Sequence, residues 1–477
     1  MSIPDYAARL AALVPSSWRV LPTDVWAHAL APRTTPPPDQ GFKIHVSATE
    51  EHADRVLELV APECVAAGVD FKVVVDGARH RILNGKRQRR EQSGKFMTIY
   101  PEEREFVPLV ERLYACTVVE PVHGPRVLSD RRFRDSEILS YRYGGFRPRS
   151  RVRYDGTVEH LIAEPDGRLV PDERRPWFQL PDWVADPFAE PVTRPLGPES
   201  AIVLDSRFRI EGSLRFSNSG GVYTGTDLLT GDPVVVKEAR PHTHVWSTTG
   251  YARDAVDLLR REHAVLLRLA GVDAVPAAIS LFTDGGHTFL AQQRVPGLPF
   301  NTFCASHEMV IAPYLHRTER LGPWTETFLA LADSLIDAVC AVHEAGLLVG
   351  DLSPGNLIVD PDGRRVRLVD LESAVAADED PVLLRHAARW VTPGFFRPSR
   401  LTADQPSVSD DLYAAAMVLY SALFPVTALF ALKPTAHQDF LAFFAERGVP
   451  ADFPAVIDAL ARGSVADARA AIGSVAR

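Results

Sequence analysis

Polar and apolar residues alternate in several short segments of the first half of the chain, as they do in strands that bury one face. Such segments are "FKIHVSA" at 42–48, "GVDFKVVVD" at 68–76 and "KFMTIYP" at 95–101. Residues 251–271 instead place apolar side chains at helical spacing, at Leu258, Leu259, Val265, Leu266 and Leu269. The pattern predicts an α+β protein whose second half passes from β-rich runs to long amphipathic helices.

A cluster of prolines separates two parts of the chain. Residues 171–198 contain seven prolines, so this segment cannot hold a long helix. We interpret it as a semi-rigid linker or wrapping segment. The sequence therefore predicts a first domain of residues 1–195, with the proline-rich linker at its end, and a second domain of residues 196–477.

Composition and charge narrow the class of protein. The net charge of −9 gives no overall field that would attract nucleic acid or anionic membranes. The four cysteines are far apart, which suits a reduced cytoplasmic protein without a structural zinc site. No apolar run approaches the roughly 18–20 residues needed to cross a bilayer, and the N-terminus lacks the basic start of a secretion signal. We expect a cytoplasmic protein with no nucleic-acid and no membrane partner.

The second half carries a series of polar residues whose order is informative. A glycine pair, Gly220 and Gly221, lies in "SNSGGVYTG", and Lys237 is near the end of the apolar run "DPVVVKEA". Glu262 follows on the expected helix. Asp351 and Asn356 follow in "DLSPGN", and Asp370 comes after the short run "VRLV". Each residue alone fits a turn or a solvated surface, but together they follow the order of the protein kinases.

The resemblance to kinases implies a role for each residue. Lys237, oriented by Glu262, would hold the phosphates of a nucleotide, with the backbone of Gly220 and Gly221 close by. Asn356 and Asp370 would bind Mg²⁺, and Asp351 would take the proton of the acceptor hydroxyl. The donor is ATP or GTP. The expected fold is bilobal, with an N-lobe at about 200–300 and a C-lobe at about 301–477.

Some positions depart from the kinase pattern and keep a pseudokinase scaffold open as an alternative. Val349 and Gly350 precede Asp351 where His and Arg are usual, and "DLE" replaces the usual DFG. Arg215 and Ser217 stand where the first two glycines of the phosphate loop are usual. Because the Arg before Asp351 is missing, we expect no switch by an activation-loop phosphate.

The first half contains a local excess of positive charge. Residues 79–95 hold seven Lys or Arg and one Glu, which composition alone would assign to a solvated loop. Lys43 and His45, however, share one face of a predicted strand, and Lys72 lies on another. Further arginines follow at Arg131, Arg132, Arg134 and Arg142. Gathered in one pocket, these cations would suit a phosphate dianion.

The same residues resemble the phosphothreonine lyases. "FKIHVS" matches the strand that supplies a phosphate-binding Lys and an acidic His, here Lys43 and His45. "FKV" would supply the base, Lys72, and Arg90 precedes "FMTIY" as a phosphate ligand. Lys95, Arg132 and Arg142 are further candidates for the phosphate, with the choice among Arg131, Arg132 and Arg134 left open. To act as the base, Lys72 must be neutral, which nearby cations favour.

The order of lyase-like residues followed by kinase-like residues resembles that of the class III lanthipeptide synthetases. The motifs "SGKF-TIYP", "LSDRR", "YRYG", "SN-GGVY" and "GD-SP-N" of that family all have counterparts here. The resemblance implies an N-terminal phosphothreonine-lyase-like domain that eliminates phosphate after a kinase-like domain has phosphorylated Ser or Thr. The substrate would be a precursor peptide with a leader and a Ser/Thr-rich core. The cyclase domain of the family is not in this sequence, so we expect it to be separate or removed. A Ser/Thr protein kinase with an N-terminal phosphopeptide-binding module is the alternative.

Overall fold

The computed structural model describes residues 3–34, 36–88, 90–173, 175, 177–189, 202–248, 251–307, 321–424, 433, 435–446 and 452–475. The predicted domain boundary near residue 195 lies outside these residues and stays a prediction. By their contacts, residues 1–223, 237–257 and 283–289 form one compact unit. Residues 224–236, 258–282 and 290–477 form the other. Each unit is described by itself below.

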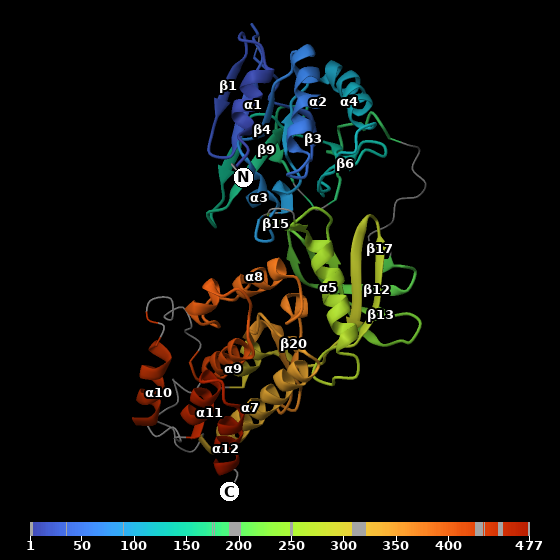
Figure 1. Cartoon of the computed structure of the whole chain (residues 1–477). Coiled ribbons are helices and arrows are strands. Elements are labelled where there is room, and N and C mark those ends of the chain that lie inside the picture. Colours follow the sequence, from blue (N-terminus) through green and yellow to red (C-terminus); the bar gives the residue numbers. More distant parts are fainter. Residues whose placement is uncertain are drawn as a thin grey trace. The chain divides into compact units, whose positions relative to one another are not determined.

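A seven-stranded antiparallel sheet is the centre of the first unit (Figure 1). Its strands follow the spatial order β1 (Arg19–Pro22), β2 (Trp26–Leu30), β4 (Phe71–Val74), β5 (Met97–Ile99), β3 (Gln40–Val46), β7 (Leu139–Gly145) and β6 (Arg131–Arg132). The three segments with strand patterns therefore form β3, β4 and β5. They lie side by side in the middle of the sheet, which makes their polar face a shared surface.

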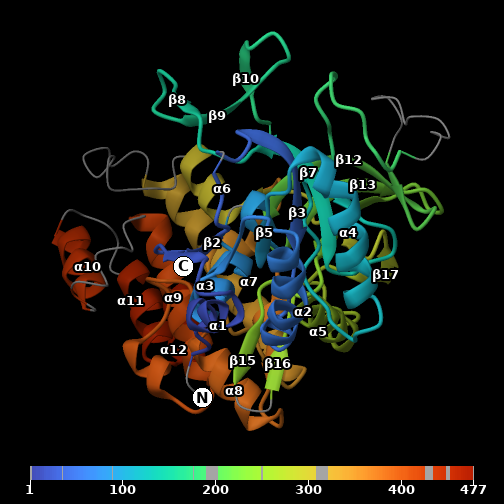
Figure 2. The same ribbon diagram turned by 90° about the horizontal axis from the view of Figure 1, so that it is seen from above.

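Helices cover the apolar face of this sheet. Alternate residues Ile44 and Val46 of β3 and Phe71 and Val73 of β4 are at most 1% exposed. They belong to a core that also takes in α1 (Tyr6–Leu13), α2 (Ala53–Ala66) and α4 (Glu103–Thr117). Figure 2 shows α2 and α4 side by side in front of β3 and β5. Because the helices bury one face, the polar residues between these apolar positions face the other side.

A smaller three-stranded sheet extends from the large one (Figure 2). Its strands are β8 (Ser150–Val152), β9 (Val158–Ala163) and β10 (Leu169–Pro171), with β9 in the middle. The Gln40 side chain joins it to β3, because its Nε2 donates to the Ala163 carbonyl at 2.7 Å and its Oε1 accepts from the Ala163 N–H at 2.6 Å. Residues of the basic run form α3 (Gly77–Asn84) and the 3-10 turn η1 (Arg90–Gln92), so part of this run is helical.

A six-stranded sheet has the strand order β11-β12-β13-β14-β18-β17. Its strands are β11 (Val203–Leu204), β12 (Phe208–Ser217), β13 (Gly220–Asp227), β14 (Pro233–Ala239), β17 (Ala278–Asp284) and β18 (His287–Gln293). A short pair, β15 (Trp246–Thr248) and β16 (Tyr251–Arg253), precedes α5 (Ala255–Arg268). The predicted helix starts later than expected, because the Asp254 carboxylate accepts from the N–H groups of Val256 and Asp257 and caps it.

The second unit is mainly helical. Its helices are α6 (Phe300–Ser306), α7 (Leu321–Glu344), α8 (Pro381–Arg389), α9 (Val408–Leu423), α10 (Ala436–Glu446), α11 (Asp452–Ala461) and α12 (Val465–Val475). Short strands carry the loop around Asp351, namely β19 (Leu298–Pro299), β20 (Leu347–Leu348), β21 (Leu357–Val359), β22 (Val366–Leu368) and β23 (Val375–Ala376), with the turns η4 (Pro354–Asn356), η5 (Leu371–Ser373) and η6 (Pro398–Thr402). Nearly all of α9 is buried, so it is the core of this unit. No helix in the described part of the chain is long and apolar enough to span a membrane.

Candidate active sites

Strand register brings the predicted residues of the first unit into one row. Across β2, β4, β5, β3 and β7, the row is His28, Lys72, Thr98, His45 and Ser140. In the same register, Lys43 on β3 is paired with Arg142 on β7. The proposed base and acid are therefore separated by one strand, with a threonine between them, on the face opposite the helices.

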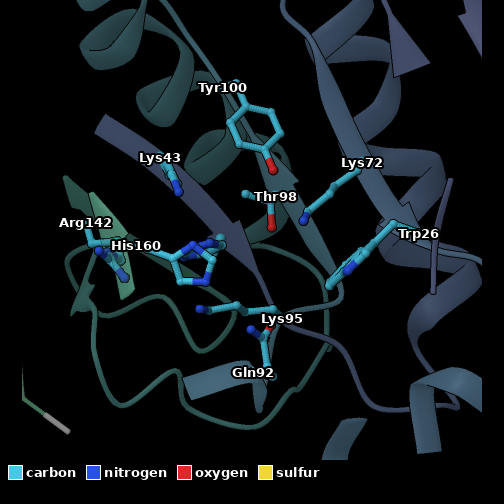
Figure 3. A pocket seen from close by; sticks show the side chains of 10 residues that line it. Trp26, Lys43, Lys72, Gln92, Lys95, Thr98, Tyr100, Arg142 and His160 are labelled. Atoms are coloured by element: carbon cyan, nitrogen blue, oxygen red, sulfur yellow. The ribbon is translucent and has the colours of Figure 1, made fainter. Parts of the chain in front are cut away.

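This face carries a cavity of about 230 Å³ (Figure 3). It is lined by ten residues, and five of them were predicted: Lys43, His45, Lys72, Lys95 and Arg142. Lys43, Lys95 and Arg142 are each less than a tenth exposed. Several buried cations around one small space are costly unless anionic groups offset them. The arrangement therefore fits a multiply charged oxyanion such as a phosphoryl group.

His45 is held by a buried carboxylate that sequence reasoning missed. Its Nδ1 bonds to Asp130, and the Ser129 hydroxyl donates to the other oxygen of the same carboxylate at 2.8 Å. Burial lowers the pKa of His45; Asp130 opposes this shift, whereas Lys95 and Lys43 add to it. Because Asp130 occupies Nδ1, Nε2 is the atom left for the substrate. The motif "LSDRR" contained Asp130, but nothing in its spacing pointed to His45.

Lys72 lies against an aromatic ring. Its Nζ is 4.1 Å from the centroid of the Trp26 ring, on the neighbouring strand β2. A ring face attracts the ammonium, whereas the cations across the cavity repel it. Trp26 therefore helps to position the amine of Lys72 at the cavity. The register of β2 against β4, which no local motif encodes, makes this contact.

Two further residues that line the cavity, and one carboxylate that contacts a lining arginine, were not predicted. Gln92 and His160 line it, and the exposed His160 comes from β9 of the small sheet. Asp172 forms an ion pair with Arg142, and its N–H donates to the His160 carbonyl at 2.8 Å. Asp172 thus fixes Arg142 and connects it to the strand that carries His160. These contacts join segments far apart in sequence, so spacing could not reveal them.

The structure corrects the placement of Arg90. Arg90 is not among the residues that line the cavity. Its Nη2 lies 3.4 Å from Oε2 of Glu238, and its guanidinium is 5.0 Å from the centroid of the Phe216 ring. In η1, this side chain lies toward Glu238. From the basic run, Lys95 and the amide of Gln92 line the cavity instead.

The arginine cluster after Val127 is also placed elsewhere. Arg131 forms an ion pair with Asp186, and Arg134 forms one with Glu111. Arg132, one of the candidate phosphate ligands, is exposed and borders a separate hollow of about 10 Å³. The edge position of β6 turns these side chains away from the cavity. Of the four arginines on β6, β7 and their connection, Arg142 is the one that lines it.

The loop around Asp351 is highly ordered by hydrogen bonds within the second unit. The Thr392 N–H and hydroxyl both donate to the Asp351 carboxylate, at 2.7 and 3.0 Å. Burial raises the pKa of Asp351, and the two bonds from Thr392 lower it. A carboxylate that is fixed in orientation and whose basicity is raised by burial suits a group that accepts a proton. Thr392 was not predicted.

Two buried residues support the backbone before Asp351. Asp411 on α9 accepts from the N–H groups of Val349 and Gly350 at 2.8 and 3.0 Å. Arg400, 2% exposed, donates to the Gly350 carbonyl at 2.8 Å. Gly350 has a φ of 86°, and a Cβ there would lie 2.5 Å from the Ser373 carbonyl oxygen. The loop therefore needs glycine where kinases usually have Arg.

A backbone hydrogen bond connects Asn356 to the residue before Asp370. The Val369 N–H donates to the Asn356 carbonyl at 2.8 Å, which brings the residue before Asp370 against Asn356. The Asn356 Nδ2 donates to the Asp351 carbonyl at 2.9 Å, so its amide oxygen is the atom available to a cation. Asp370 has a φ of 63°, rare for a residue with a side chain and typical of functional sites.

These oxygens fit a magnesium ion held jointly with a nucleotide. Within the described residues, no group of three or more His, Cys, Asp or Glu side chains could hold a metal by itself. Mg²⁺ is usually bound by one or two protein oxygens together with substrate phosphates, and one amide and one carboxylate meet that need.

The remaining kinase candidates are placed on the expected elements. Lys237 is on β14 and Glu262 on α5, and both are buried. A Cβ at Gly220 would lie 1.8 Å from the Glu238 carbonyl oxygen, so packing alone requires this glycine. Asn218, fully buried, donates through Nδ2 to the carbonyls of Leu83 and Gly85. The nucleotide-binding roles of Lys237, Gly220 and Gly221 stay predictions.

Comparisons with known proteins agree with this order of sites. Residues 6–195 match the family described as RamC, N-terminal domain. The chain is 38% identical over 425 residues to the protein named "Probable SapB synthase" of Streptomyces coelicolor, which covers 88% of this chain and 43% of that protein. This chain therefore spans less than half the length of that relative.

The second half also matches protein kinases. It is 25% identical over 235 residues to the serine/threonine-protein kinase pkn2 of Myxococcus xanthus, covering 48% of this chain and 25% of that kinase. It is 24% identical over 232 residues to PknA of Mycobacterium tuberculosis, covering 48% of this chain and 49% of that kinase. The predicted kinase-like domain after an N-terminal domain is confirmed. The resemblance to the class III lanthipeptide synthetases read from the motifs is confirmed as well, by the family match over residues 6–195 and by the 38% identity over 88% of this chain.

Proposed function

We propose that this chain dehydrates Ser and Thr residues of a precursor peptide in two steps. The kinase-like domain would phosphorylate the hydroxyl, and the cavity that contains Lys72 and His45 would then eliminate the phosphate. The observation that carries this proposal is the row of Lys72, Thr98 and His45 across three strands, beside Lys43, Lys95 and Arg142. This arrangement supports Lys72 as the base, His45 as the acid and the three cations as ligands of the phosphate.

In the elimination step, Lys72 takes the Cα proton of the phosphorylated residue. The electrons of the C–H bond form the Cα=Cβ double bond, and the bond between Cβ and the phosphate oxygen breaks. His45 gives its proton to that oxygen, and Lys43, Lys95 and Arg142 stabilise the negative charge on the leaving phosphate. The products are inorganic phosphate and dehydroalanine from Ser or dehydrobutyrine from Thr. This step requires no metal.

In the phosphorylation step, the chain's own residues position the reactants. Asp351 orients the acceptor hydroxyl and takes its proton, while Thr392 fixes the carboxylate. Lys237, oriented by Glu262, would bind nucleotide phosphates. Asn356 and Asp370 would hold Mg²⁺, which neutralises charge on the phosphates when it is bound. ATP and GTP are both compatible donors. Ring formation would need a cyclase, as a separate protein or a further domain.

Two substrates test the proposal with the full chain. A synthetic phosphoserine peptide without nucleotide should lose its phosphate, which is measured as free phosphate and as a dehydroalanine product in mass spectrometry. The unphosphorylated peptide should react only when Mg²⁺ and nucleotide are added. Binding of the phosphopeptide without any elimination would contradict the proposal and indicate a phosphopeptide-binding module beside a kinase.

A further inference from the structure

The sheet that carries His160 has one face that continues the cavity. Antiparallel register pairs Ser150 with His160 and Val152 with Val158, so these four side chains share a face of β8 and β9. His160 lines the cavity, and Val152 and Val158 lie beyond it along the same two strands. The two valines are 72% and 57% exposed. An apolar cross-strand pair thus lies in solvent next to a highly cationic cavity.

Hydrogen bonds and an ion pair connect this small sheet to the strands around the cavity. The two hydrogen bonds between Gln40 and Ala163 join the end of β9 to the start of β3, the strand that carries Lys43 and His45. On the other side, Asp172 connects the His160 backbone to Arg142. The strand that carries Val158 is therefore joined by hydrogen bonds to the strands that carry the proposed phosphate site, although β8 and β9 extend away from the large sheet (Figure 2).

Because the cavity is small, the rest of a peptide substrate must lie on a surface outside it. A cavity of about 230 Å³ has room for the phosphorylated residue but not for a peptide. The residues on either side of the phosphorylated one must leave over the rim, and β9 forms part of that rim through His160. A peptide that leaves along this strand meets Val158 and Val152 next. These side chains have no charge or hydrogen-bonding group, so they favour apolar neighbours.

We infer that Val152 and Val158, together with His160, form a platform for apolar residues that flank the phosphorylated Ser or Thr of the substrate. The inference rests on the proposed elimination function and adds a sequence preference to it. The occupant is the peptide substrate itself, since the platform is continuous with the cavity that would bind its phosphoryl group. His160 would contact the peptide at the point where it leaves the cavity.

The test compares three phosphoserine substrates with the full chain. One peptide has leucines flanking the phosphoserine, a second has asparagines at the same positions, and the third is N-acetyl-phosphoserine methylamide. For the wild type, kcat/KM for phosphate release should be about tenfold higher with the leucine peptide than with the asparagine peptide. The double substitution V152T/V158T should bring this ratio close to one and leave the methylamide unaffected.

Leu169→Thr is the matched control. Leu169 is 47% exposed and pairs with Ala163, so it lies on the opposite face of the same small sheet. This variant should keep the wild-type ratio. A ratio that is unchanged in V152T/V158T, or lowered equally by Leu169→Thr, would overturn the platform while the methylamide still reports elimination. Failure of the wild type to release phosphate from all three substrates would instead overturn the proposed function, and the platform with it.

Discussion

His45 has to carry a proton when the phosphate leaves, although its surroundings disfavour the imidazolium. Burial lowers its pKa, and so do the charges of Lys95 and Lys43. Asp130 is the group that opposes this shift. A phosphate dianion entering the cavity would add negative charge on the other side of the ring and favour the imidazolium further. The phosphorylated substrate would thus favour the protonated form of His45, the acid that releases its phosphate.

Asp130→Asn should reduce elimination without removing His45. The amide no longer stabilises the imidazolium, so the pKa of His45 falls further and the protonated form is lost at a lower pH. We expect the alkaline limb of the pH profile for phosphate release to move to lower pH. At neutral pH the rate should fall by about 10²-fold, the lower end of the contribution of general acid catalysis. An unchanged profile in stopped phosphate-release assays would show that Asp130 does not act through His45.

Thr392→Val tests the corresponding residue of the kinase half. Asp351 can accept a proton only as a carboxylate, so phosphorylation is lost as the pH falls through its pKa. Burial raises that pKa, and the Thr392 hydroxyl is the largest group that lowers it. Removing the hydroxyl should therefore move the acid limb of the phosphorylation profile to higher pH. Thr392→Ser, which keeps a hydroxyl, should retain the wild-type limb; the same shift in both variants would contradict this account.

At the scale of elements, alternation in the sequence predicted the strands but not their neighbours. Lys43 and His45 were expected on one face of a strand, and β3 places them so. Trp26, Asp130 and His160 could not be found, because their contacts arise from the register of β2, β6, β7 and β9 against distant segments. Arg90 was misplaced for the same reason. Local sequence shows that it follows a basic helix, but not that η1 directs it toward Glu238.

The kinase residues were easier to predict from the sequence, because each motif lies within a single short element. Asp351 and Asn356 are five residues apart in one loop, and their contact is local. Gly220 shows where prediction from motifs is limited. This glycine was expected because it would lie near phosphates, but its close approach to the Glu238 backbone already requires a glycine there. Thr392 and Arg400 come from later turns and reach Asp351 or Gly350 only after folding.

Gly350→Ala tests how far the loop before Asp351 depends on backbone conformation. The left-handed φ alone costs a residue with a Cβ about 1–2 kcal/mol. The 2.5 Å approach to Ser373 adds strain, so the loop must shift. We expect slower phosphorylation and a lower midpoint of thermal unfolding, with elimination from a phosphoserine peptide unchanged. Wild-type phosphorylation and stability would show that this strain is absent in solution.

At the scale of the whole molecule, the proposal requires two reactions that can be separated by substitution. Asp351→Asn keeps the shape of the side chain but removes the group that accepts the proton. Phosphorylation should fall by at least about 10²-fold, as expected for loss of a general base. A peptide that is already phosphorylated should still be dehydrated at the wild-type rate. Loss of both activities, with a folded protein by circular dichroism, would argue against two separate sites.

The most direct test of the central claim is the product made by Lys72→Ala from an unphosphorylated peptide with Mg²⁺ and nucleotide. Lys72 is the proposed acceptor of the Cα proton, and the substitution leaves Asp351, Asn356 and Asp370 in place. Mass spectrometry should show peptides that gain about 80 Da at each modified residue, the mass of one transferred phosphoryl group, and that react no further. Wild type should show losses of water instead. Dehydration by Lys72→Ala at the wild-type rate would contradict the claim that this cavity is a lysine-dependent lyase.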